Sequence, residues 1–302
     1  MPLLQAGPWI RYDSEVNPLV IFGCGYVGTR LAKAALAEGR QVRVCSRSTG
    51  RLQPLLALGA EVKFLDAGTP KNFTSAMSSM AGSTVVYSIP PVTSLPPGHA
   101  MRAALQAAYG GGATRFIYFS SCGLYGDEPD NDTWIDEDTP LRPDAAMQNI
   151  KSDELEIERA SFDRLRTVVL RLAPVYGPGR GVRARMRKGD YRILDEGQHA
   201  TSRIHVDDVV RIVFAAEAKA PPKSIYLVAD DEPTTQGDYA KWLSERLGLP
   251  LPPYRQMVEP GKGKVAHRNR RIRNAKLKRE LDIALLYPSF REGEAAIESE
   301  GT

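Results

Sequence analysis

Leu19-Val20-Ile21-Phe22-Gly23-Cys24-Gly25-Tyr26-Val27-Gly28 is the stretch that decides the fold of this chain. Its apolar residues indicate a short buried strand, and its glycines follow in the spacing G-x-G-x-x-G. Residues 29–38 then carry apolar side chains at helical spacing, Gly39 stands where a helix ends, and Val42-Arg43-Val44 begins a second strand. A strand, a glycine turn and a helix present backbone N–H groups and a positive helix-dipole end to a diphosphate. The stretch therefore predicts a dinucleotide site formed by Gly23, Gly25, Tyr26, Val27 and Gly28.

Alternating strand and helix signals continue along the chain. The expected strands cover residues 62–65, 84–87, 115–119 and 167–171, and the expected helices cover residues 51–58, 73–80, 101–109 and 145–160. This order predicts an α/β fold with a doubly wound parallel (Rossmann) sheet. In such a sheet the ligand lies at the carboxyl ends of the strands, where the strand order reverses.

The pattern becomes more fragmentary after Arg171, beginning with a turn-rich stretch at residues 174–181. We expect residues 1–18 to form an N-terminal extension and residues 19–175 to form the dinucleotide-binding domain, to which residues 203–229 return. Residues 176–202 and 230–302 are expected to form a smaller C-terminal lobe that closes over the strand ends and binds substrate.

Composition excludes several classes of protein. The 302 residues are 42% hydrophobic and 25% charged, which is typical of a soluble globular protein. No apolar run approaches the roughly 18–20 residues that cross a membrane, and the first residues do not resemble a secretory signal. Cys24, Cys45 and Cys122 form no C-x-x-C pair, so we expect neither disulfides nor a metal site. Reduced thiols favour a cytoplasmic location.

One segment supplies much of the net charge of +4. Its basic residues are Lys262, Lys264, Arg268, Arg270, Arg271, Arg273, Lys276, Lys278 and Arg279. Such a run is typical of a nucleic-acid surface, of contacts with an anionic substrate, or of a solvated helix. No aromatic residue is interleaved for stacking on bases. Nucleic-acid binding, which would weaken steeply with salt, is therefore kept only as a minor hypothesis.

The end of the second strand distinguishes between dinucleotides. An NAD site places an acidic residue there for the ribose hydroxyls, whereas an NADP site places a residue that tolerates a phosphate. Here the strand runs out through Cys45-Ser46-Arg47-Ser48 without an acid. Arg47 can pair with a phosphate through two hydrogen bonds, and Ser46 can add a hydroxyl. We therefore favour NADP over NAD, the alternative being a solvent-facing arginine.

Three further residues are candidates for the cofactor site. Asp66 follows the third strand, where it either accepts a hydrogen bond from the adenine amino group or starts the turn before Gly68. Ser88 and Pro90 follow the fourth strand, where their backbone would line the cofactor. The two consecutive prolines at 90 and 91 also serve as a rigid bend.

Three later blocks complete a family pattern. They are Phe119-Ser120-Ser121-Cys122-Gly123-Leu124-Tyr125-Gly126, Leu172-Ala173-Pro174-Val175-Tyr176-Gly177-Pro178-Gly179 and Ile204-His205-Val206-Asp207-Asp208-Val209. Together with the glycines, the chain resembles the extended short-chain dehydrogenase/reductase superfamily, in its NAD(P)-dependent epimerase/dehydratase group. The resemblance spans residues 19–292. Residues 224–234 and 269–281 are similar to an atypical branch of that group.

The resemblance implies a catalytic serine and a Tyr-x-x-x-Lys pair, in which tyrosine is the acid/base and lysine holds the nicotinamide ribose. By position, Ser121 is the serine and Lys151 is the lysine, which also places Lys151 in the cofactor site. Met147 stands where the tyrosine is expected. A thioether has no proton to relay, so the chain departs from the usual chemistry. The first glycine of the family's G-x-x-G-x-x-G is also replaced, by Phe22.

Other groups are candidates to supply the proton. Tyr125 and Tyr176 are expected to be packing anchors, Cys122 neighbours Ser121, and His205 precedes Asp207, which we expect to cap the following helix. An acidic loop that either touches substrate or is simply solvated holds Asp127, Glu128, Asp136, Glu137 and Asp138.

Two functional hypotheses lead. The first is an NADP(H)-binding oxidoreductase or epimerase/dehydratase-like enzyme that acts on a polar small molecule. Anionic molecules and nucleotide-sugar-like molecules are both among the substrates that this hypothesis allows. The second is a non-catalytic NADP(H)-binding sensor or regulatory protein that has lost turnover with its tyrosine. The resemblance also implies a homodimer as the assembly. From the composition we expect no membrane partner, and a nucleic-acid partner only under the minor hypothesis above.

Overall fold

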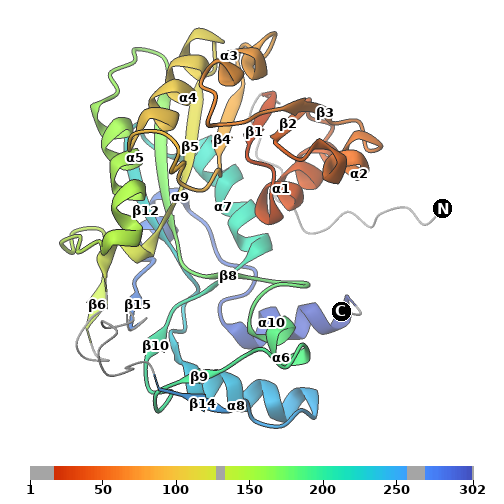
Figure 1. Cartoon of the computed structure of the whole chain (residues 1–302), viewed down its shortest axis with the longest axis vertical. Coiled ribbons are helices and arrows are strands. Elements are labelled where there is room, and N and C mark those ends of the chain that lie inside the picture. The colour runs from red at the N-terminus through yellow and green to blue at the C-terminus, as the bar shows by residue number, and fades with distance from the viewer. Residues whose placement is uncertain (1–16, 127–132, 257–268, 301–302) are drawn as a thin grey trace.

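The computed structural model describes residues 17–126, 133–256 and 269–300, and its largest element is a parallel sheet (Figure 1). Across the sheet the order is β12 (Ser224–Val228), β7 (Arg166–Leu172), β5 (Arg115–Ser121), β4 (Thr84–Tyr87), β1 (Leu19–Phe22), β2 (Val42–Ser46) and β3 (Glu61–Phe64). Every pairing within it is parallel. The order reverses between β1 and β4, which defines a Rossmann sheet. The predicted doubly wound fold is confirmed.

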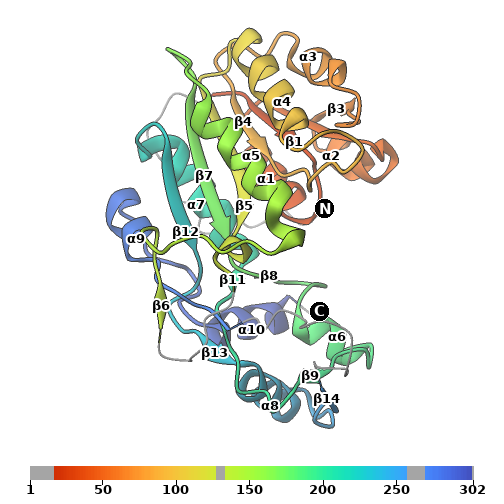
Figure 2. The same cartoon turned by 60° about the vertical axis from the view of Figure 1, so that its left-hand side comes forward.

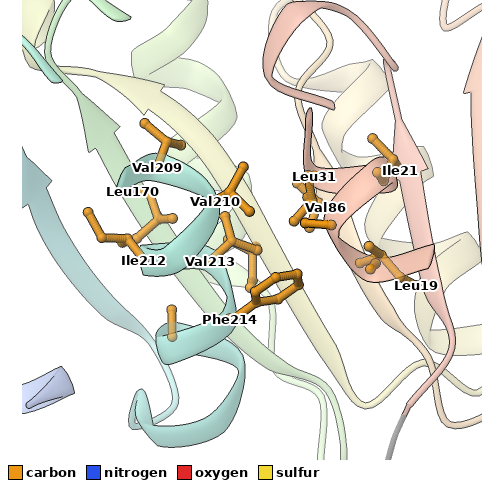
Figure 3. Packing of buried hydrophobic residues seen from close by; sticks show 14 of the residues in the cluster. Leu19, Ile21, Leu31, Val86, Leu170, Val209, Val210, Ile212, Val213 and Phe214 are labelled. Carbon is orange, nitrogen blue, oxygen red and sulfur yellow. The ribbon is translucent and has the colours of Figure 1, made fainter. Parts of the chain in front are cut away.

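Helices cover both faces of the sheet (Figure 2). One face carries α1 (Tyr26–Ala37), α2 (Gln53–Leu56), α7 (Val206–Lys219) and α9 (Ala275–Leu281); the other carries α3 (Lys71–Met77), α4 (His99–Gly110) and α5 (Gln148–Arg159). Successive side chains of β1 point to opposite faces of the sheet, and all of them are apolar. Leu19 and Ile21 pack on the first face, and Val20 and Phe22 pack on the second. In Figure 3, Phe214 of α7 lies on the side that faces α1.

A smaller group of elements lies at the carboxyl ends of the strands (Figure 1). Its helices are α6 (Val182–Arg187), α8 (Gln236–Leu247) and α10 (Phe290–Ser299). Its two-residue strands are β6 (Trp134–Ile135), β8 (Val175–Tyr176), β9 (Ile193–Leu194), β10 (Ala200–Thr201), β11 (Ile204–His205), β13 (Thr234–Thr235), β14 (Tyr254–Arg255) and β15 (Arg271–Ile272). Tyr176, Ile193, Tyr239, Leu243 and Phe290 belong to a separate apolar core of this lobe.

A buried ion pair joins α7 to the sheet at the amino ends of the strands, away from the lobe. Arg40 donates two hydrogen bonds to the Glu217 carboxylate, at 2.8 and 2.7 Å, and two more to the backbone carbonyl of Asn17. Glu217 also accepts from the hydroxyl of Thr84 at 2.6 Å. Both charged side chains are buried, so each depends on the other for compensation. Within the described ranges, no helix has the length and apolarity to traverse a lipid bilayer.

Glu217→Ala is expected to lower the free energy of unfolding by about 3–5 kcal/mol, because it leaves the Arg40 guanidinium buried without a counter-charge. Denaturation with urea, followed by circular dichroism, measures this loss. Glu158→Ala removes an exposed carboxylate of α5 and is the matched control, with an expected change within about 0.5 kcal/mol. Equal effects of the two substitutions would contradict the assignment.

Candidate functional site

The loop between β1 and α1 has a backbone that only glycine can follow at its first position. Gly23 has φ +87°, and a Cβ atom there would lie 2.7 Å from the Ile89 Cγ1 atom and 2.8 Å from the Ile89 backbone nitrogen. The hydroxyl of Ser88 donates to the carbonyl of Gly23 at 2.6 Å. Ser88 therefore holds the loop against the end of β4.

The same loop leaves open space at the start of α1. A Cβ atom at Gly25 would meet nothing within 4 Å, whereas one at Gly28 would lie 3.1 Å from Ile21 Cγ2. Gly28 thus lets the helix pack closely on β1, and Gly25 leaves room above it. No side chain caps α1, and its first turn contains no acidic residue. Its uncapped N–H groups, including those near Tyr26 and Val27, suit an anion, so the loop fits a diphosphate.

The cofactor candidates on the neighbouring strands lie where parallel strands end. Arg47 follows β2, is exposed, and forms no hydrogen bond or ion pair with any residue that the structure describes. Ser46 accepts from the backbone N–H of Ser48 at 3.1 Å. Asp66 accepts from the backbone N–H of Gly68 at 3.0 Å through one carboxylate oxygen. This bond starts the turn before Gly68, which is one of the two roles expected of Asp66.

Pro90 completes this side of the site. It is exposed just past β4, two residues beyond Ser88 and next to the Ile89 that covers Gly23. Its backbone position is therefore set by the same contact that fixes the glycine loop.

Ser121 and Met147 meet around Gly123. The oxygen of Ser121 accepts from the backbone N–H of Gly123 at 3.0 Å and caps the short 3-10 helix at Cys122–Tyr125. A Cβ atom at Gly123 would lie 2.7 Å from the Met147 sulfur and 3.0 Å from the Ser121 hydroxyl oxygen. The structure therefore brings together the serine and the thioether that stands in the acid/base position.

Lys151 lies on α5, whose start follows Met147 directly. The side chain is half-buried, and its ammonium forms no hydrogen bond or ion pair with the described part of the chain. The oxygen of Asp144 accepts from the backbone N–H of Met147 at 3.0 Å and begins the turn that leads into this helix.

Tyr125 and Cys122 lie in a buried network that sequence reasoning did not identify. Arg171 donates to the Tyr125 hydroxyl oxygen at 2.6 Å and to both oxygens of Glu154, at 3.0 and 2.7 Å. Ser120 donates to the same carboxylate at 2.5 Å. Burial raises the pKa of Tyr125 well above its usual value and that of Cys122 to about 12. Both side chains are anchors, as the sequence analysis expected of Tyr125.

Tyr176, His205 and Asp207 are buried where the lobe meets the sheet. His205 lies edge-on to the Tyr176 ring at 5.2 Å, and burial lowers its pKa to about 3, so its ring stays neutral. The expectation that Asp207 caps α7 was wrong. The helix begins at Val206, and the His205 ring nitrogen accepts from the backbone N–H of Asp207 at 3.3 Å.

Three of the five acidic loop residues, Asp136, Glu137 and Asp138, lie within the described ranges. Glu137 accepts from the backbone N–H of Leu227 at 3.0 Å, and Asp136 from the hydroxyl of Thr139 at 2.9 Å. Asp138 is exposed. Asp127 and Glu128 lie outside the described residues, as do residues 262–268 of the basic segment.

Comparison with known proteins agrees with the glycine loop and the sheet order. Residues 19–229 match the NAD dependent epimerase/dehydratase family. The chain belongs to this family. The NAD in the family's description agrees with the dinucleotide site that the loop geometry indicates.

Similar proteins have diverse reactions. A 3-diazoavenalumate denitrifying reductase from a Streptomyces species is 29% identical over 258 residues, which cover 78% of this chain and 82% of that one. A 4-hydroxy-2-methyl-3-oxo-4-farnesyl-3,4-dihydroquinoline-1-oxide ketoreductase from Stigmatella aurantiaca is 26% identical over 251 residues, covering 78% and 74%. The structure of UDP-glucose 4-epimerase from Thermotoga maritima with UDP-glucose has a TM-score of 0.79 and 23% identity, covering 94% and 97%, and shows the shared fold.

Two glycine substitutions separate folding from dinucleotide binding. Gly23→Ala is expected to destabilise the fold by about 1–3 kcal/mol, because it forces an L residue into a positive φ against Ile89. Gly25→Ala should unfold at nearly the wild-type temperature, yet bind NADPH or NADH about tenfold more weakly or worse, since its methyl group fills the diphosphate space.

Thermal unfolding and isothermal titration calorimetry measure the two properties. Gly110→Ala, at another open position at the end of α4, is the matched control and should change neither. Unchanged dinucleotide affinity in Gly25→Ala would show that the diphosphate does not lie on this loop.

Proposed function

We propose that this protein is an NADP(H)-dependent reductase acting on a polar small molecule. The observation that carries the proposal is the arrangement of Ser121, Met147 and Lys151. The Ser121 hydroxyl lies at the end of β5 and Lys151 lies in the first turn of α5, while a thioether stands where the family resemblance implies the phenol that exchanges a proton with the substrate.

The residues that would hold NADPH are those at the strand ends. The glycine loop would bind the diphosphate, and Arg47 and Ser46 the 2′-phosphate. Asp66, which bonds Gly68 through one carboxylate oxygen, would accept from the adenine amino group through the other, and Lys151 would bind the nicotinamide ribose. Bound NADPH supplies a hydride. Arg47 supports the choice of NADP because it is exposed at the expected point and has no protein anion with which to pair in the described ranges.

The replacement of the expected tyrosine by Met147 favours reduction over epimerisation or dehydration. Those reactions begin by removing a proton from a substrate alcohol, which needs a base. Tyr125, Cys122, Tyr176 and His205 are each at most 3% exposed, so none of them is a candidate base that a substrate reaches. Reduction of an electrophile does not need this step.

Ser121 has a suitable role in such a reduction. Its oxygen already accepts from the Gly123 backbone, which leaves its O–H free to donate to the atom that gains negative charge. Lys151, in the first turn of α5, would hold the nicotinamide ribose as proposed above. The proton that completes the reduction would then come from water. The names of the two relatives above, a reductase and a ketoreductase, support this direction.

Arg47→Ala tests the cofactor assignment. We expect about tenfold weaker binding of NADPH with little change for NADH, because a charged hydrogen-bonding partner of the 2′-phosphate is lost. Lys33→Ala, which removes an exposed cation of α1, is the control and should leave both affinities unchanged. An equal loss for the two dinucleotides would rule out Arg47 as the 2′-phosphate partner.

Turnover is tested by NADPH oxidation in the presence of carbonyl, quinone, diazo and nucleotide-sugar substrates. Wild-type protein should oxidise NADPH with at least one of these classes. Ser121→Ala should lower kcat by about 10²-fold through loss of a transition-state donor, at unchanged NADPH affinity. Restoring Met147→Tyr separates the alternatives.

A reductase should keep its activity or gain it in Met147→Tyr. A non-catalytic sensor, the second hypothesis that the thioether supports, would bind NADPH tightly and show no turnover in either form. Wild-type protein that binds no nicotinamide dinucleotide at millimolar concentration would overturn both.

A further inference from the structure

The turn that follows β8 contacts Tyr26, the residue that follows the glycine loop, although the two are far apart in sequence. The hydroxyl of Tyr26 donates to the carbonyl of Pro178 at 3.1 Å. A Cβ atom at Gly177 would lie 2.5 Å from the same hydroxyl oxygen, so the turn approaches this closely because position 177 has no side chain. The lobe therefore contacts the chain at the first residue of α1.

Arg180 is carried by this turn. Its backbone N–H and carbonyl pair with those of Gly177 at 2.9 and 3.1 Å, which closes the loop on itself. Gly179 and Gly181 on either side have φ +71° and +109°, a conformation that glycine adopts freely. The backbone that carries the cationic side chain of Arg180 is therefore held in a tight turn.

The guanidinium of Arg180 lies over the Tyr26 ring, 5.1 Å from its centroid. The side chain is exposed and forms no hydrogen bond or ion pair with described residues. The other arginine near this ring differs, because Arg30 is paired with Asp207 at 3.2 Å and with Glu300 at 3.3 Å. Arg180 is thus a cation that Tyr26 positions beside the diphosphate loop without a protein anion to neutralise it.

We propose that Arg180 is a diphosphate-binding residue, reaching from the lobe to the cofactor on the glycine loop. The inference rests on the proposed dinucleotide binding. Arginine binds phosphate oxygens through paired hydrogen bonds, and this contact is stronger than the exposed cation–π contact with Tyr26. The Tyr26 ring and the Pro178 hydrogen bond then hold the side chain near its target before the cofactor arrives.

Ligands that differ in the diphosphate test this role. Arg180→Ala should bind NADPH and ADP-ribose about tenfold more weakly than wild type, and should bind adenosine 2′-monophosphate, which has no diphosphate, as wild type does. Arg180→Lys should recover part of the loss, since it keeps the charge without the paired geometry. Isothermal titration calorimetry measures each dissociation constant.

Two further variants make the result specific. Arg187→Ala removes another exposed cation of the same lobe and should bind all three ligands normally. Arg47→Ala should show the opposite pattern to Arg180→Ala, with weaker binding of adenosine 2′-monophosphate and unchanged binding of ADP-ribose.

Three outcomes would overturn the proposal. They are wild-type affinity of Arg180→Ala for ADP-ribose, an equal loss for adenosine 2′-monophosphate, and an equal loss in Arg187→Ala. The first two leave the proposed function standing if wild-type protein binds NADPH. Failure of wild-type protein to bind any dinucleotide would instead remove the proposed function and, with it, the role of Arg180.

Discussion

The contact between the glycine loop and the ends of β2 and β4 is the constraint on which the site depends. The backbone N–H groups of Gly23 and Cys24 both donate to the Cys45 carbonyl, at 3.0 and 2.9 Å. From the other side, the Ser88 hydroxyl donates to Gly23, and Ile89 covers it. The loop is therefore fixed between two strands before any ligand binds. Because Arg47 follows β2 directly, its place relative to the loop is set by the same contacts.

A second set of contacts fixes α5 against β5 and β7. Glu154 on α5 accepts from Ser120 on β5 and from Arg171 on β7, so one buried carboxylate joins a helix to two strands. Ser120 precedes Ser121, and Glu154 lies within a turn of Lys151. These contacts therefore fix the backbone next to both candidate residues.

Much of this architecture could be predicted from the sequence because it depends on local patterns. The alternation of β1, the glycine spacing and the apolar periodicity of α8 and α10 are each contained within a few residues. Ser121 and Met147 could be matched to family positions for the same reason, since both belong to motifs with fixed spacing, and the structure brings them together around Gly123. By contrast, α6 falls just after a glycine-rich turn, and its short basic sequence carries little periodicity.

The remaining features depend on partners distant in sequence. The residues around Asp207 do not indicate that His205 caps α7. Which residue is the cap depends on where the helix begins after β11. The sequence likewise does not predict the ion pair between Glu154 and Arg171, since charged residues on a helix are more commonly exposed to solvent. These buried polar contacts form only after the sheet brings β5, β7 and α5 together.

Two contacts of α1 with other parts of the chain differ in their charge balance. Arg30 forms ion pairs with Asp207 of α7 and with Glu300 at the end of α10, so its charge is matched by protein carboxylates. Tyr26 instead contacts a turn whose cation, Arg180, has no anionic partner in the described ranges. An anion on the loop would therefore be attracted from the lobe side as well as from the helix N-terminus. Because Tyr26 already holds Arg180 on the loop side of the lobe, this cation would not have to be brought there from elsewhere when an anion binds.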